Sequence, residues 1–283
     1  MNPTLPIKSE RMKVPGATIY YEVRGSGPVL LMMPGGPADA SAFGNIAGHL
    51  DSDYTVVTYD PRGLSHSPLE GPFDDDRAVQ IFADDTHRLL NATTTDPAFV
   101  FASSGGATIA LELVARHPEQ VRTLVAHEPP SPILQPDPTR ERAAMEEIVD
   151  AYRASGIGAA MQKFMVQTRI RRTPPPPPPG EPTPEMREAQ ARFERNMHFW
   201  LGHYFRSIGV YEPDFSRLKS VSTRIVPAVG DESRGEMAHD GGLGLAKALG
   251  TEAVVFPGAH GGFETDAPAF AVKLREVLQQ QRG

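Results

Sequence analysis

Short apolar runs alternate with stretches of helical periodicity along most of the chain. A continuous apolar run at residues 28–33 is typical of a strand buried on both faces of a parallel sheet, and residues 17–23 alternate as a half-buried strand does. Further strands are predicted at 54–59, 98–102, 121–126, 224–230 and 252–256, with helices at 79–90, 108–115, 243–249 and 267–281. This order predicts a mostly parallel, doubly wound α/β sheet flanked by helices.

The alternation stops between residues 131 and 219. Amphipathic helices are predicted at 140–153 and 158–168, and six prolines, Pro174 to Pro179, follow as a stiff spacer without backbone donors. A third helix at 184–205 carries apolar and aromatic side chains at three- and four-residue intervals: Phe193, Met197, Trp200, Leu201 and Tyr204. We interpret residues 131–219 as a helical cap inserted into a core made of residues 1–130 and 220–283.

The strongest chemical signal is the turn at residues 102–106, where an apolar strand ends at a serine and a helix begins. Small residues two positions before and after Ser104, Ala102 and Gly106, let the neighbouring backbones pass without collision. If Ser103 were the nucleophile instead, Phe101 would occupy the crowded position two residues before it. We therefore predict that Ser104 is a nucleophile on a strained turn, at the positive end of the helix that follows.

A glycine-rich loop, Pro34-Gly35-Gly36-Pro37, follows the buried strand at 28–33. Glycine lets a backbone come close to a substrate, and backbone N–H groups can stabilise the oxyanion that forms when a carbonyl is attacked. We predict Gly36 as one such donor and Gly105, the residue after the nucleophile, as the other.

A serine hydroxyl needs a base within hydrogen-bond reach and a third group that orients the base. Of the nine histidines, His260 combines a glycine-flanked loop after the last strand with a late position in the chain. We predict it as the base. His49, His117 and His239 lie in helix-like or turn contexts, and we expect them at the surface.

Two carboxylates compete for the role of the acid. Glu128 stands at the end of the strand at 121–126, and Asp231 follows the strand at 224–230. Three residues beyond Gly230 the chain has Ser233, which carries no charge. A buried carboxylate needs a partner, and the strand-end position of Glu128 points to one. We prefer Glu128 and keep Asp231 as the alternative acid.

These motifs together resemble the α/β-hydrolase fold, which implies an eight-stranded, mostly parallel sheet with an inserted helical cap. Four short segments give a more specific resemblance, to the zearalenone lactonase group of this fold. They are Ala102-Ser103-Ser104-Gly105, His127-Glu128-Pro129-Pro130, Trp200 with Tyr204, and Pro257-Gly258-Ala259-His260. The resemblance implies a triad of Ser104, Glu128 and His260 and a substrate contact from Trp200. We expect Tyr204 and His127 as further contacts. The chain departs from that group at Ala102, in the loop at 34–37 and in the proline run.

Composition narrows the class of protein. The chain has 283 residues, 40% of them hydrophobic, without an apolar run long enough for a membrane span and without a secretion signal at its start. It has no cysteine, which excludes disulfides, a thiol nucleophile and thiolate metal sites. A net charge of −7 disfavours a nucleic-acid surface. We expect a cytoplasmic enzyme without a cofactor or metal that binds a small molecule, neither nucleic acid nor membrane.

The resulting hypothesis is a serine hydrolase that cleaves an ester or lactone of a small hydrophobic substrate through an acyl-enzyme, a zearalenone-type macrolactone being one candidate. A C–C bond hydrolase or a non-hydrolytic cyclase of polyketide-like substrates is the alternative among enzymes. A noncatalytic small-molecule receptor is the alternative from another class. The sequence leaves the oligomeric state open.

Overall fold

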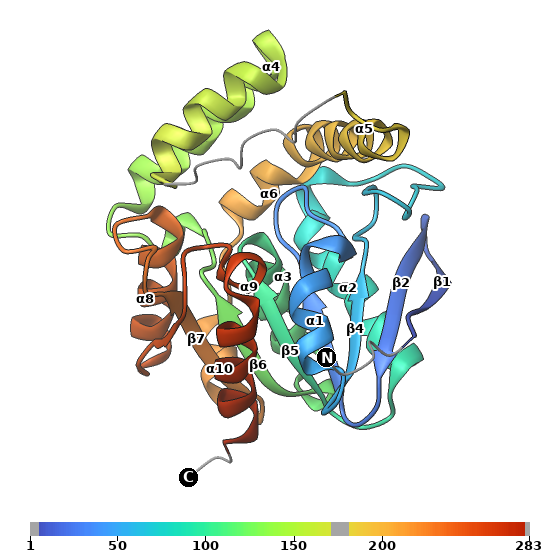
Figure 1. Cartoon of the computed structure of the whole chain (residues 1–283). Coiled ribbons are helices and arrows are strands. Elements are labelled where there is room, and N and C mark those ends of the chain that lie inside the picture. The colour runs from blue at the N-terminus through green and yellow to red at the C-terminus, as the bar shows by residue number, and fades with distance from the viewer. Residues whose placement is uncertain (1–5, 171–180, 281–283) are drawn as a thin grey trace.

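An eight-stranded sheet forms the centre of the protein (Figure 1). The structure is a computed structural model that describes residues 6–170 and 181–280. The strands are β1 (Lys8–Val14), β2 (Ala17–Gly25), β3 (Val29–Met33), β4 (Thr55–Tyr59), β5 (Ala98–Ser103), β6 (Val121–His127), β7 (Arg224–Gly230) and β8 (Val254–Phe256). They are ordered β1-β2-β4-β3-β5-β6-β7-β8, and neighbours pair in parallel except where β2 meets β1 and β4. The predicted mostly parallel sheet is confirmed.

Helices cover both faces of this sheet. They are α1 (Gly44–Leu50), α2 (Ala78–Thr93), α3 (Gly105–Arg116), α4 (Pro138–Thr168), α5 (Pro184–Phe199), α6 (Phe205–Val210), α7 (Phe215–Ser220), α8 (Met237–Leu249), α9 (Gly262–Thr265) and α10 (Ala267–Gln279). Helices α1 and α10 pack on one face, and α2 and α3 on the other (Figure 1). None of the helices in the described ranges combines the length and apolar character needed to cross a bilayer.

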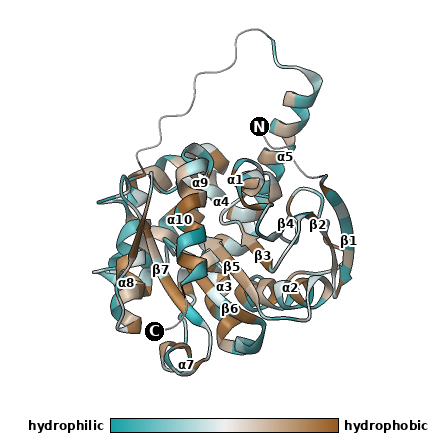
Figure 2. Ribbon diagram, turned by 60° about the horizontal axis from the view of Figure 1, so that its bottom comes forward, coloured by the Kyte–Doolittle hydropathy of each residue, from teal (hydrophilic) through white to brown (hydrophobic). Residues whose placement is uncertain are grey.

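The core consists of two apolar layers, one on each face of the sheet. Every residue of β3 and β5 is buried, as the continuous apolar runs predict for strands covered on both sides. Figure 2 shows the hydrophobic colour in strands inside the sheet, such as β7, with helices around them. Because the central strands are fixed from both faces, the residues that follow their carboxyl ends are held in defined positions.

The chain between β6 and β7 forms most of the structure above those carboxyl ends. Helix α4 is interrupted at Gly156, whose φ of +78° favours glycine, so it consists of two helical segments, as the sequence predicts. Helix α5 continues through a π-helical turn, Trp200–Tyr204, into α6. Helix α7 instead lies against α3, where Arg217 Nε donates to the carbonyl of Ala115 at 3.2 Å. The proline run lies outside the described residues.

The structure contains strand β1 and helix α1, which were not among the predicted elements. Strand β1 has the sequence KSERMKV and pairs with β2 along its whole length, from Lys8 beside Val23 to Val14 beside Ala17. Its residues are mostly polar and partly exposed because it forms the edge of the sheet. Such a strand lacks the apolar pattern from which the other strands were predicted.

Candidate active site

Two of the predicted site residues follow adjacent parallel strands. Ser103 of β5 pairs with His127 of β6, so Ser104 and Glu128 occupy equivalent positions one residue further on. Both have left-handed backbones, with φ of +56° and +52°. The N–H of Ser104 donates to the carbonyl of His127 at 2.9 Å, and the N–H of Glu128 donates to that of Ala228 at 3.0 Å. Residues other than glycine keep this uncommon backbone conformation only where surrounding contacts enforce it, as here at the carboxyl ends of β5 and β6.

His260 lies between β8 and α9 and contacts Glu128. Its Nδ1 is 2.6 Å from Glu128 Oε2. Because an ionised carboxylate only accepts hydrogen bonds, Nδ1 carries the proton, which leaves Nε2 as the free acceptor of the neutral ring. The alternative acid, Asp231, is exposed, and its Oδ1 accepts the N–H of Gly258 at 2.7 Å. Of the two carboxylates, the structure therefore brings Glu128 to His260.

Glu128 is fully buried, and its second carboxylate oxygen also accepts hydrogen bonds. Oε1 accepts the N–H of Gly230 at 2.8 Å and the hydroxyl of Ser233. Burial by itself would raise the pKa of Glu128, but the hydrogen bond from His260, the nearby histidines and the Gly230 amide hold that pKa well below its usual range. The carboxyl group is therefore ionised across the neutral range.

Ser233 connects this carboxylate to a further histidine. Its Oγ lies 3.1 Å from His239 Nδ1 while it donates to Glu128. The prediction that His239 lies at the surface is wrong, because its side chain is buried at the start of α8, facing the Ser233 turn. Sequence patterns could not show this contact, which depends on how α8 packs over the end of β7.

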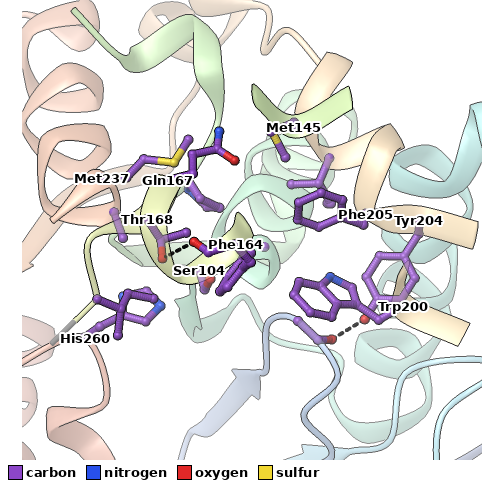
Figure 3. Close-up of a pocket in the computed structure, with 16 residues that line it drawn as sticks. Ser104, Met145, Phe164, Gln167, Thr168, Trp200, Tyr204, Phe205, Met237 and His260 are labelled. Atoms are coloured by element: carbon purple, nitrogen blue, oxygen red, sulfur yellow. Dashed lines mark hydrogen bonds between the residues drawn. The ribbon is translucent and has the colours of Figure 1, made fainter. Parts of the chain in front are cut away.

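Ser104 and His260 line the same cavity, which Figure 3 shows with both side chains labelled. In the part of the chain that the structure describes, no hydrogen bond joins Ser104 Oγ to the imidazole; such catalytic contacts are often long until substrate is bound. The cavity lies between the carboxyl ends of the strands and the helices of residues 131–210. Its lining is mostly apolar and consists of Gly36, Ser104, Gly105, Pro130, Met145, Phe164, Gln167, Thr168, Ile170, Trp200, Tyr204, Phe205, Ile208, Met237, Ala238 and His260.

The two predicted oxyanion donors are also neighbours. A Cβ placed on Gly105 would lie 3.6 Å from the amide nitrogen of Gly36. Glycine is required in this arrangement, because a Cβ on Gly35 would come within 2.6 Å of the Ser103 carbonyl and one on Gly106 within 2.4 Å of the Pro34 carbonyl. Gly105 begins α3, where helix N–H groups have no partner within the helix. Gly36 and Gly105 both line the cavity that Ser104 also lines.

The π-helical turn supplies Trp200 and Tyr204, which both line the cavity. The Tyr204 hydroxyl donates to the carbonyl of Gly36, a contact drawn in Figure 3. Burial raises the pKa of Tyr204, so this hydroxyl stays protonated. From the preceding helix α5, Asn196 Nδ2 donates to the carbonyl of Pro37 at 3.0 Å. Tyr204 thus lines the cavity, while its hydroxyl holds the loop at 34–37.

Comparison with known proteins agrees with this architecture. A model of the alpha/beta hydrolase fold family matches residues 28–159. The uncharacterized hydrolase YraK of Bacillus subtilis (strain 168) is 36% identical over 284 residues, which cover 98% of each chain. The chain belongs to the α/β-hydrolase family.

Two further proteins are similar to this hydrolase at lower sequence identity. The zearalenone hydrolase of Bionectria ochroleuca is 24% identical over 94% of this chain and 95% of that protein. The structure of a thermophilic esterase from Thermogutta terrifontis superposes with a TM-score of 0.70, covering 95% of this chain and 98% of that one at 16% identity. The second similarity is one of fold.

His127 does not contact the cavity of the hydrolase. Its side chain is fully buried among aromatic rings, including Phe263 and Phe270, and its ring lies 6.1 Å from that of His260. The expectation of a substrate contact is therefore corrected: parallel strands alternate their side chains between faces, and His127 points into the layer beneath α10. Burial lowers the pKa of His127 to about 4, so the ring is neutral.

His127, Glu128 and His260 also place three potential metal ligands within 4.8 Å of one another. Histidine and carboxylate ligands suit zinc, but a catalytic zinc ion needs an open position toward the substrate. Here His127 is separated from the cavity, and both oxygens of Glu128 already accept hydrogen bonds. The three residues fit a hydrogen-bonded acid and base better than a catalytic metal.

We predict that His127→Phe makes the stability of the hydrolase less sensitive to acid. As the pH falls from about 6.5 to 4, the unfolded chain takes up a proton at residue 127 that the folded protein excludes, so the free energy of unfolding decreases by about 3 kcal/mol. The phenylalanine variant lacks this contribution. Urea unfolding over a series of pH values measures it, with His49→Gln at an exposed position as the control. Equal pH slopes in wild type and H127F would contradict the prediction.

Proposed function

We propose that this hydrolase cleaves an ester or lactone bond of a small, uncharged, hydrophobic substrate through an acyl-enzyme on Ser104. The observation that carries the proposal is the 2.6 Å contact between Glu128 and His260 at the wall of the cavity that contains Ser104. A carboxylate, an imidazole and a serine in this order form a catalytic triad. Serine supports acyl transfer, in which the covalent intermediate is itself an ester that water can cleave.

The reaction begins with attack of Ser104 Oγ on the substrate carbonyl. His260 Nε2 takes the hydroxyl proton, and Glu128 stabilises the imidazolium that results. The amides of Gly36 and Gly105 donate to the oxyanion of the tetrahedral intermediate. His260 then returns the proton to the departing alcohol oxygen. Water, activated by the same histidine, attacks the acyl-enzyme and releases the carboxylic acid and free Ser104.

The chemistry of the cavity supports an uncharged substrate. Among its described lining residues there is no carboxylate, lysine or arginine, and the walls are formed mainly by aromatic, aliphatic and methionine side chains. Apolar walls with a few convergent polar groups are typical of small-molecule sites. Similarity to a zearalenone hydrolase and to an esterase favours an ester or lactone, and a zearalenone-type macrolactone is the first substrate to assay.

We predict that a fluorophosphonate probe labels the folded hydrolase covalently at Ser104. The phosphonyl group imitates the tetrahedral intermediate and reacts only with a serine that has been activated by a base. Mass spectrometry of the intact protein and its peptides locates the adduct. Ser104→Ala serves as the matched variant and is expected to remain unlabelled. A folded wild type that stays unlabelled would favour a noncatalytic receptor.

Glu128→Gln is expected to lower kcat for ester hydrolysis by about 10³- to 10⁴-fold. The amide oxygen can replace Oε1 as acceptor for Gly230 and Ser233, which leaves the NH₂ group toward His260. The ring must then present an acceptor at Nδ1 and a proton at Nε2, which is the tautomer that cannot take the Ser104 proton. Asp231→Asn is the control and should retain most of the activity; the opposite result would assign the acid to Asp231.

Tyr204→Phe is expected to lower kcat on the order of tenfold with little change in KM. The ring that lines the cavity is kept, but Gly36 loses the donor that fixes its peptide. Because the oxyanion forms only in the transition state, a misplaced Gly36 amide affects the chemical step more than substrate binding. Steady-state kinetics with a p-nitrophenyl ester measure both constants. Tyr152→Phe, outside the cavity, is the control, and an equal loss in both variants would refute the role of Tyr204.

A further inference from the structure

Gln167 is a polar side chain of the cavity that the proposed reaction does not use. Gln167, in the last turn of α4, lines the cavity on the side away from the strands. The hydroxyl of the neighbouring Thr168 already has a hydrogen-bond partner within the helix, because it donates to the carbonyl of Phe164 at 2.8 Å. Gln167 differs, because only one end of its amide is bonded to the protein.

The orientation of this amide is fixed by Glu141. Gln167 Nε2 donates to the Glu141 carbonyl at 3.0 Å and lies 3.3 Å from Glu141 Oε2. Both partners are acceptors, so the NH₂ group must face them and the oxygen must face the other way. Figure 3 shows the red amide oxygen of Gln167 turned toward Met145 and Phe205. This oxygen is buried and has no hydrogen-bond partner among the residues that the structure describes.

A buried acceptor without a donor is unfavourable, and the side chains toward which this oxygen is turned offer none. The side chains of Met145, Phe205 and Met237 carry no N–H or O–H group. A ligand that brings a hydroxyl to this point would satisfy the oxygen, whereas an ether oxygen or a carboxylate would face it with a second acceptor. Sites built to pair with a hydroxyl discriminate strongly against analogues that lack it.

We propose that Gln167 Oε1 accepts a hydrogen bond from a hydroxyl group of the substrate, remote from the bond that is cleaved. The preferred substrates are then hydroxylated esters or lactones, and Gln167 selects them over their ether or deoxy analogues. This inference rests on the proposed ester hydrolysis and specifies the class of substrate that the same cavity takes.

The experiment compares matched pairs of esters. Methyl esters of ω-hydroxyalkanoic acids and monoacetates of α,ω-diols are each assayed beside their ω-methoxy counterparts, with the chain lengthened one methylene at a time. Acid release is followed by titration at constant pH. The variant is Gln167→Met, which keeps an unbranched side chain without the acceptor, and Gln190→Met on the exposed surface of α5 is its control.

In wild type and Q190M, kcat/KM at the best chain length is expected to favour the hydroxyl compound by about tenfold. In Q167M this ratio should fall close to one, chiefly through loss on the hydroxyl compound. A wild-type ratio near one at every chain length in both series overturns the inference, and this result does not depend on folding of the variant. A preference that persists in folded Q167M overturns it as well.

If the proposed ester hydrolysis itself is wrong, these assays give a different result. In that case wild type releases no acid from any ester and takes no fluorophosphonate label. The inference is then decided by thermal unfolding in the presence of α,ω-diols or their dimethyl ethers. A larger increase in Tm with the diol, absent in Q167M, supports the role of Gln167, and equal increases overturn it.

Discussion

The site depends on keeping one carboxylate charged inside the protein. Desolvation of an unpaired charge costs several kcal/mol, and Glu128 has no access to water. The cost is met by donors from three different segments: His260 after β8, the Gly230 amide at the end of β7 and Ser233 in the following turn. Each donor lies where a parallel strand ends, so the register of the sheet and the ionisation of Glu128 are linked. A shift in β7 or β8 would remove part of this set of donors.

The sequence predicted the sheet and the site to different extents. Continuous apolar runs and the order of strands and helices were sufficient to predict the central sheet, because a strand that is buried on both faces consists almost entirely of apolar residues. The small residues around Ser104 predicted the strained turn, and its φ of +56° agrees. For Glu128 and Asp231, strand-end position gave only a preference. The structure separates them by side-chain direction, which depends on the pairing of β6 with β7 and on the turn after β7.

Other features could not be predicted from local patterns. The burial of His239 beside Ser233, the aromatic surroundings of His127 and the bond from Tyr204 to Gly36 all join segments distant in the sequence. For Tyr204, the expectation of a substrate contact came from the family resemblance, and the residue lines the cavity. Spacing carries no information about the hydroxyl, whose acceptor belongs to a loop that precedes it by 168 positions. Polar atoms at the ends of side chains are assigned by tertiary contacts rather than by periodicity.

These contacts couple the walls of the cavity to its chemistry. Helix α5 and the π-helical turn hold the loop at 34–37 through Asn196 and Tyr204, and the same turn contributes Trp200 to the cavity. The backbone that we propose as an oxyanion donor is therefore held by side chains of the segment that also lines the cavity. A substitution of Tyr204 therefore affects both the wall of the cavity and the support of Gly36. With the proposed mechanism, specificity and rate are coupled, since both depend on how these helices pack on the loop at 34–37.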